Sequence, residues 1–226
     1  GFLLTGNSNN SAWVLRLDKK LNVIWEQRLN YHSLPAQIRS SICTFDENIF
    51  FVGTLEESNE NKMWIGGITS KGEKIFDKIF PVSQATEGAS IIEINEKTLG
   101  ICGYHNHPRN RENGFFCTVD RSGNLLKYSS VGGREFDKLN DLTLLFNGDV
   151  ALVGTSNSFS RGARRSSAWT VILNKKMNTD MNRTAGKTIA NPMSNITVAN
   201  FQTLPQLCCN EQTAAFWQLV FQVKKF

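Results

Sequence analysis

The stretch Phe50-Phe51-Val52-Gly53 is an apolar run that ends in a glycine, and it decides the fold because the chain repeats it. Three other runs of the same kind end at Gly6, Gly103 and Gly154, so that consecutive glycines are separated by 47, 50 and 51 residues. A period of about 50 residues is typical of a protein built from one supersecondary unit that is copied along the chain.

Each glycine-ending run is followed by a strand-like segment that contains a large aromatic residue. These aromatic residues are Trp13, Trp64, Phe115 and Trp169. Turns begin five residues after them, each with a side chain that can bond nearby backbone, at Asp18, Thr69, Asp120 and Asn174. Three copies also carry a strand and a tight turn before the run, with the strands starting at Ile42, Ile91 and Leu142. Each unit is therefore predicted to contain four short strands.

A four-stranded meander cannot cover its own apolar faces, and helical periodicity is absent from the repeats. Radial stacking of such meanders is the expected solution, which predicts an all-β chain folded as a β-propeller of four-stranded antiparallel blades. Residues 1–226 are expected to form a single domain, with blades at about 1–31, 32–81, 82–132 and 133–186. The glycines are expected where another backbone approaches closely or the strand bends, and the aromatic residues where neighbouring blades pack.

Two copies resemble the repeats of bacterial β-propellers: Leu4-Thr5-Gly6-Asn7-Ser8 with Trp13 to Asp18, and Val153 to Ser158 with Ser167-Ala168-Trp169. The resemblance implies a propeller and carries no catalytic residue. The first copy lacks its opening strand, and residues 187–226 depart from the repeat. We favour the interpretation that these last residues form a degenerate fifth blade and lend a strand to the first blade. The alternative is that the copies are consecutive blades of a larger ring.

Composition narrows the class of protein. Hydrophobic residues make up 40% of the chain and charged residues 20%, which predicts a globular protein. The net charge of +5 arises from 25 basic and 20 acidic residues, a mixture that argues against a dedicated nucleic-acid binder. No apolar run reaches the length of a membrane span, and no signal peptide is visible. Because the chain opens within a predicted strand and without Met, we expect it to derive from a longer polypeptide.

The cysteines are odd in number and most lie in apolar strand-like runs: Cys43, Cys102, Cys117, Cys208 and Cys209. Buried free thiols are the favoured interpretation, and they favour the cytoplasm over the periplasm or the cell surface. The alternative is a disulfide between Cys102 and Cys117, which could face each other across a predicted hairpin. The adjacent Cys208 and Cys209 are interpreted as the end of a strand.

The loops between the second and third strands of successive blades should lie side by side on one face of a propeller. Two of them are basic, and together they define a candidate binding rim of Arg109, Arg111, Arg161, Arg164, Arg165, His105 and His107. Arginines in such a cluster could contact the carboxylate, phosphate or sulfate groups of an anionic ligand. A neighbouring loop is acidic, with Glu56, Glu57 and Glu60. No metal site is expected, because the two histidines lack a third ligand nearby.

No motif marks a nucleophile, a zinc site or a phosphate-binding loop, so neither a catalytic residue nor a cofactor is predicted. The favoured function is a non-catalytic interaction module: a protein-binding, targeting or regulatory part of a larger bacterial protein, which would bind a protein partner or a covalently linked domain. The alternative is a secreted or periplasmic propeller that binds or cleaves carbohydrate. The sequence separates the two poorly, because its tryptophans lie where packing alone would place them.

Overall fold

The computed structural model describes residues 1–58, 60–80, 86–107, 111–159 and 166–174. Within them the chain forms strands and no helix, so no described segment is a helix able to span a membrane. The strands belong to four antiparallel sheets of three or four strands each. In every sheet the strands pair in chain order, which makes each sheet the meander that the repeat predicts.

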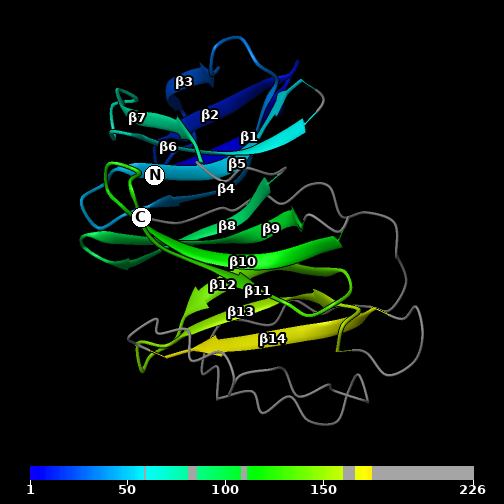
Figure 1. The fold of residues 1–226 in the computed structure, drawn as a ribbon. Coiled ribbons are helices and arrows are strands. Elements are labelled where there is room, and N and C mark those ends of the chain that lie inside the picture. Colours follow the sequence, from blue (N-terminus) through cyan, green and yellow to red (C-terminus); the bar gives the residue numbers. More distant parts are fainter. Residues whose placement is uncertain (59, 81–85, 108–110, 160–165, 175–226) are drawn as a thin grey trace, which may run out of the picture.

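The sheets follow one another along the chain, and Figure 1 shows them in that order from blue at the top to yellow at the bottom. Sheet 1 contains β1 (Phe2–Ser8), β2 (Ser11–Leu17) and β3 (Val23–Leu29). Sheet 2 contains β4 (Ala36–Cys43), β5 (Ile49–Glu57), β6 (Glu60–Ile68) and β7 (Lys74–Ile79). Sheet 3 contains β8 (Thr86–Asn95), β9 (Thr98–His107), β10 (Arg111–Asp120) and β11 (Leu125–Val131). Sheet 4 contains β12 (Asp137–Leu144), β13 (Val150–Ser156) and β14 (Ser167–Leu173).

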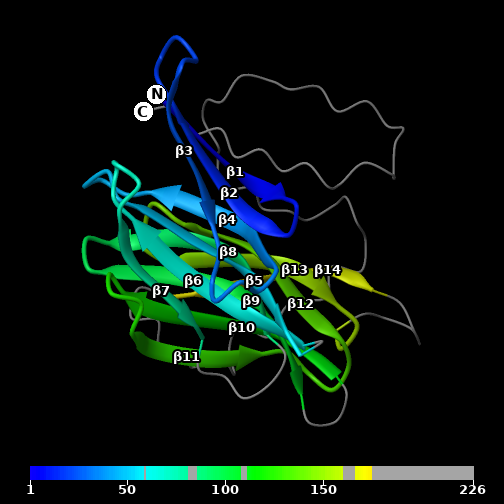
Figure 2. The same cartoon turned by 90° about the horizontal axis from the view of Figure 1, so that it is seen from above.

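Each sheet packs face to face on the next, as the blades of a propeller do (Figures 1 and 2). The fold class predicted from the repeat is thereby confirmed: the chain is all-β, with antiparallel propeller blades. Sheet 1 begins with the counterpart of β5, β9 and β13, in keeping with the missing opening strand of the first copy. The predictions of a fifth blade and of ring closure concern residues 187–226, which lie outside the described part of the chain.

Three apolar cores lie between consecutive sheets, and the repeated aromatic residues belong to them. Trp64 packs toward sheet 1, Phe115 toward sheet 2 and Trp169 toward sheet 3, so each faces the preceding blade. Their exposed fractions are 1%, 0% and 5%. Trp13 is only half-buried, because the described residues contain no sheet on its side of sheet 1. The expected packing role is confirmed for three of the four aromatic residues.

The repeated glycines face a kink in the neighbouring strand. The first strands β4, β8 and β12 each contain a register shift next to the glycine of the second strand. A Cβ atom added to Gly53 would lie 1.8 Å from the carbonyl oxygen of Gln37. The corresponding distances are 2.0 Å from Gly103 to Glu87 and 1.9 Å from Gly154 to Lys138. Close backbone approach therefore explains why the repeat needs glycine at these places.

The predicted turns that begin at Asp18, Thr69 and Asp120 form as side-chain-capped turns, whereas the turn predicted after Asn174 lies outside the described residues. The Asp120 carboxylate accepts hydrogen bonds from the backbone N–H groups of Ser122 and Asn124, each at 2.8 Å. Gly123 has φ +73°, as expected for a glycine in such a turn. In the first copy the positive φ falls on Leu21 (+68°), which takes the place of Gly123 in the turn.

Cys102 and Cys117 are buried free thiols on opposite faces of sheet 3. Cys117 points into the core shared with sheet 2, whereas Cys102 points into the core shared with sheet 4. The alternative of a disulfide across this hairpin is therefore wrong, because the two side chains alternate to different faces of the sheet. Burial raises the pKa of both thiols far above the ordinary value, which keeps them protonated.

Candidate functional site

The bulges of the first strands bring polar side chains together at one end of the sheets. The register shifts leave Arg39 in β4, Ala89 in β8 and Asn140 in β12 without a partner in the ladder. The residue two places before each of them is polar and exposed or half-exposed. These residues are Gln37, Glu87 and Lys138. Bulges of this kind re-aim side chains and are common next to functional sites.

Glu87 is the centre of contacts that join sheets 2 and 3. Its Oε2 atom lies 3.6 Å from Nη2 of Arg39, which comes from the bulge of β4. The same oxygen accepts a hydrogen bond from the Tyr104 hydroxyl at 2.5 Å. The other oxygen, Oε1, accepts one from the Asn61 amide at 2.7 Å. Both oxygens of this carboxylate are therefore occupied by donors from neighbouring strands.

Lys138 extends the contacts to sheet 4. Its Nζ atom lies 4.1 Å above the centre of the Tyr104 ring and 2.6 Å from Oε2 of Glu112. We call the five side chains Arg39, Glu87, Tyr104, Glu112 and Lys138 the inter-sheet charge cluster. Two cations and two carboxylates alternate around one tyrosine in this cluster, so that their formal charges cancel.

Exposure divides the cluster into an outer and an inner layer. The side chains of Arg39 and Lys138 are 49% and 36% exposed, whereas those of Glu87 and Glu112 are 19% and 27% exposed. Burial raises the pKa of Tyr104, and its hydrogen bond to Glu87 raises it further. The phenol consequently remains a protonated donor at neutral pH. The solvent-facing layer therefore offers mainly hydrogen-bond donors and positive charge.

A buried carboxylate beside the cluster fixes the local backbone. Asp137 is fully buried at the start of β12, and its Oδ1 atom accepts a hydrogen bond from the Ser156 hydroxyl. Its Oδ2 atom accepts from the N–H of Gly133 at 2.7 Å and from the Ser158 hydroxyl at 2.6 Å. Asp137 thus joins the segments that enter β12 and leave β13, and it holds the backbone next to Lys138 in place.

Some of the residues predicted from sequence belong to the described part of the chain. Glu56 and Glu57 close β5, Glu60 opens β6, and all three are exposed. Arg111 opens β10 and pairs with His107 of β9. His105 is buried, and its Nδ1 atom lies 3.0 Å from the Tyr128 hydroxyl.

The remaining arginines of the candidate rim are Arg109, Arg161, Arg164 and Arg165, and they lie outside the described residues. A binding role for the rim stays a prediction. Nowhere in the described part of the chain do three His, Cys, Asp or Glu side chains gather closely enough to hold a metal ion.

Comparison with known proteins gives only distant structural neighbours. No family model and no curated protein matches the chain. A GH32 β-fructofuranosidase of Bombyx mori, solved with sucrose, is 8% identical with a TM-score of 0.43, over 77% of this chain and 47% of that one. A protein of unknown function from Bacteroides caccae is 12% identical with a TM-score of 0.25, over 77% of this chain and 90% of that one. At these values neither resemblance assigns an activity to this chain.

Proposed function

We propose that this chain is a non-catalytic interaction module that binds an acidic surface of a protein partner through the inter-sheet charge cluster. The observation that carries the proposal is the layered arrangement of the cluster, with Arg39 and Lys138 outside and the carboxylates inside. Tyrosine and arginine are the residue types that most often dominate protein interfaces, and Tyr104 and Arg39 lie on either side of Glu87.

The contacts of the carboxylates support binding over catalysis. General acid–base chemistry needs a carboxyl group within hydrogen-bond reach of the substrate. Donors from the protein occupy both oxygens of Glu87, and Lys138 holds one oxygen of Glu112. These contacts also orient the two cations, because each is tied to a carboxylate of another strand. A partner that presents carboxylates would meet two preorganised cations in the outer layer of a cluster whose formal charges cancel.

We expect charge reversal in the cluster to abolish partner capture. The immobilised chain is incubated with a lysate of its source organism, and the double variant Arg39→Glu/Lys138→Glu is compared with the wild type by quantitative mass spectrometry. The variant should capture at least about tenfold less of the proteins that the wild type captures. The reason is that truncating or reversing interfacial charges costs about 2 kcal/mol or more of binding free energy. Raising the salt concentration should weaken wild-type capture, because exposed charges are screened.

The matched control is Lys19→Glu/Lys20→Glu, which makes the same change in net charge at exposed positions in the β2–β3 turn. This control should capture the same proteins as the wild type, and circular dichroism should show that both variants are folded. Equal capture by the wild type and the cluster variant would contradict the proposal. Hydrolysis of an oligosaccharide by the wild type but not by Glu87→Gln would contradict it as well and would indicate a catalytic site.

A further inference from the structure

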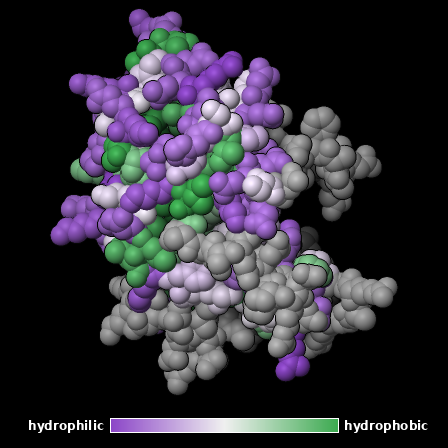
Figure 3. Space-filling model, turned by 45° about the horizontal axis from the view of Figure 1, so that its top comes forward, coloured by the Kyte–Doolittle hydropathy of each residue, from purple (hydrophilic) through white to green (hydrophobic). Residues whose placement is uncertain are grey.

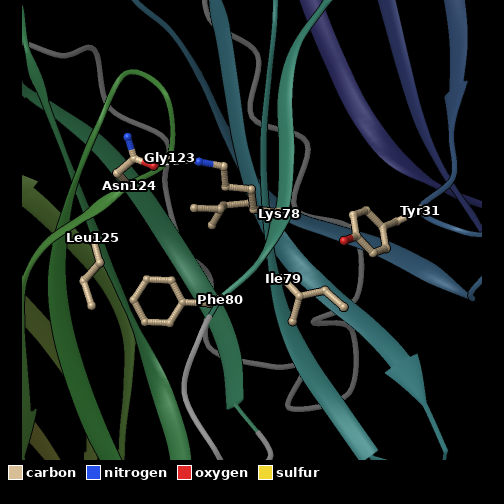
Figure 4. Close-up of a pocket in the computed structure, with 8 residues that line it drawn as sticks. Tyr31, Lys78, Ile79, Phe80, Gly123, Asn124 and Leu125 are labelled. Atoms are coloured by element: carbon tan, nitrogen blue, oxygen red, sulfur yellow. Dashed lines mark hydrogen bonds between the residues drawn. The ribbon is translucent and has the colours of Figure 1, made fainter.

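A concave feature that contains no residue of the inter-sheet charge cluster lies beside β7 of sheet 2 and the start of β11 in sheet 3. It is a groove of about 380 Å³ between β7 and the segment that leads into β11, and Figure 4 shows the side chains that line it. This volume falls within the range of small-molecule sites. On the face shown in Figure 3 apolar areas are interspersed with hydrophilic residues.

The lower part of the groove is apolar. Ile65 and Phe80 belong to the core between sheets 2 and 3, with exposed fractions of 2% and 3%, and both contribute to the wall. Leu125 faces them from β11 and is 40% exposed. A ring contact with Tyr128, at 6.2 Å between centroids, holds Phe80 in position. An apolar ligand placed here would cover Leu125 and would contact side chains that already lie away from water.

The upper part of the groove holds a cation, the ammonium group of Lys78. Nζ of Lys78 donates a hydrogen bond to the side-chain oxygen of Asn124 at 2.7 Å and lies 5.9 Å from the centre of the Phe76 ring. No carboxylate among the described residues forms an ion pair with Lys78. By contrast, Lys74 of the same strand lies 3.7 Å from a carboxylate oxygen of Asp77.

The nearby carboxylate of Asp120 is already used by its own turn. Its Oδ2 atom accepts a hydrogen bond from the Asn124 amide at 2.9 Å, and its Oδ1 atom accepts from two backbone N–H groups. Partial burial acts to raise the pKa of Asp120, but the hydrogen bonds from Asn124 and Ser122 and the nearby positive charge of Lys78 lower it overall, so that Asp120 remains an ionised acceptor inside the turn. Lys78 thus has Asp120 as an electrostatic neighbour without a direct ion pair to it, and its side chain lies beside Asn124 in the lining of the groove, as Figure 4 shows.

We propose that this groove binds a small amphipathic anion, namely a free carboxylic acid with an aromatic or alkyl body. The body would lie between Phe80 and Leu125, and the carboxylate would take a charge-assisted hydrogen bond from Lys78. The groove combines an ammonium group that forms no direct ion pair with a described carboxylate and an apolar wall, and this combination favours an amphipathic anion over a neutral apolar ligand and over a fully polar anion. The site is independent of the inter-sheet charge cluster.

The test uses an isosteric pair of probes, naphthalene-2-acetate and its neutral amide, with binding measured by isothermal titration calorimetry. The acid is expected to bind saturably with one site per chain and more tightly than the amide. Lys78→Met should weaken binding of the acid about tenfold or more, because it removes a charge-assisted hydrogen bond, and should weaken binding of the amide clearly less. Lys74→Met on the same strand is the matched control and should bind the acid as the wild type does.

A second variant guards against loss of fold. Leu125→Glu changes an exposed residue and should weaken both probes, since it places a carboxylate in the apolar part of the groove. Lack of saturable binding, or equal affinity of the acid for the wild type and Lys78→Met, would overturn the proposal. The cluster variant Arg39→Glu/Lys138→Glu should still bind the acid, so failure of the groove and failure of the partner surface can be told apart.

Discussion

Replacing Gly103 by alanine is expected to destabilise the folded chain by about 3 kcal/mol or more. A Cβ atom at this position would lie 2.0 Å from the carbonyl oxygen of Glu87 and 2.8 Å from the Phe115 ring. The first obstacle is backbone, which cannot rotate away as a flexible side chain can. Relief of the clash would require the bulge of β8 to move, and with it the strand that supports Glu87. Urea denaturation followed by tryptophan fluorescence measures the loss.

Gly6 supplies the matched control for this experiment. It occupies the same place in the repeat, opposite Trp13, but the nearest atom to an added Cβ is a Trp13 side-chain carbon at 3.8 Å. Gly6→Ala is therefore expected to change the stability by less than about 1 kcal/mol, partly because alanine restricts the unfolded chain. Equal destabilisation at Gly6 and Gly103 would show that the repeat glycines are needed for a reason other than the bulged strand.

Truncation of the aromatic residues between sheets is expected to have the next largest effect. Trp64→Ala and Phe115→Ala should each cost roughly 3–5 kcal/mol, because each removes a fully buried ring and leaves a cavity between two sheets. Trp64→Phe should be tolerated much better. Among the described residues the buried Nε1 of Trp64 has no hydrogen-bond partner, so its removal leaves no acceptor unsatisfied there, and phenylalanine keeps most of the apolar contact.

Trp13→Ala tests whether burial between sheets, and not the aromatic residue itself, sets this cost. Trp13 is half-buried, and its Nε1 atom donates a hydrogen bond to Glu26 at 2.7 Å. We expect its truncation to destabilise the chain clearly less than truncation of Trp64, when both are measured by urea denaturation under the same conditions. An equal loss at the two positions would mean that Trp13 is covered as fully as its counterparts are.

Much of the fold could be predicted from the sequence because its signals are local and repeated. The glycine-ending runs mark second strands, the aromatic residues mark third strands, and residues such as Asp120 mark the turns after them. The bulges left no such signal. They depend on how the first strand pairs with the second, and their extra residues Arg39, Ala89 and Asn140 differ in size and charge.

The candidate site was harder to predict for the same reason. Sequence reasoning favoured the long basic loops, whereas the inter-sheet charge cluster is built from strand residues of three different copies. Tyr104 directly follows the repeated glycine and faces Glu87 across the sheet, but Thr54 and Thr155 occupy its place in the neighbouring copies. Alignment of the copies on their glycines could have singled out Tyr104. It could not have shown that Arg39 and Lys138 approach it from the adjacent sheets.

The central claim is that consecutive copies lie face to face as neighbouring blades, and an engineered cross-link tests it most directly. The hydroxyl oxygens of Thr5 in β1 and Ser41 in β4 are 3.0 Å apart, so thiols at these positions should come within reach of a disulfide bond with a small shift. The double variant Thr5→Cys/Ser41→Cys, in a Cys43→Ser background, is oxidised mildly and mapped by mass spectrometry of its peptides. We predict a cross-linked peptide that joins sheets 1 and 2. Recovery of both engineered thiols in their alkylated, uncrosslinked form from the folded protein would contradict the arrangement.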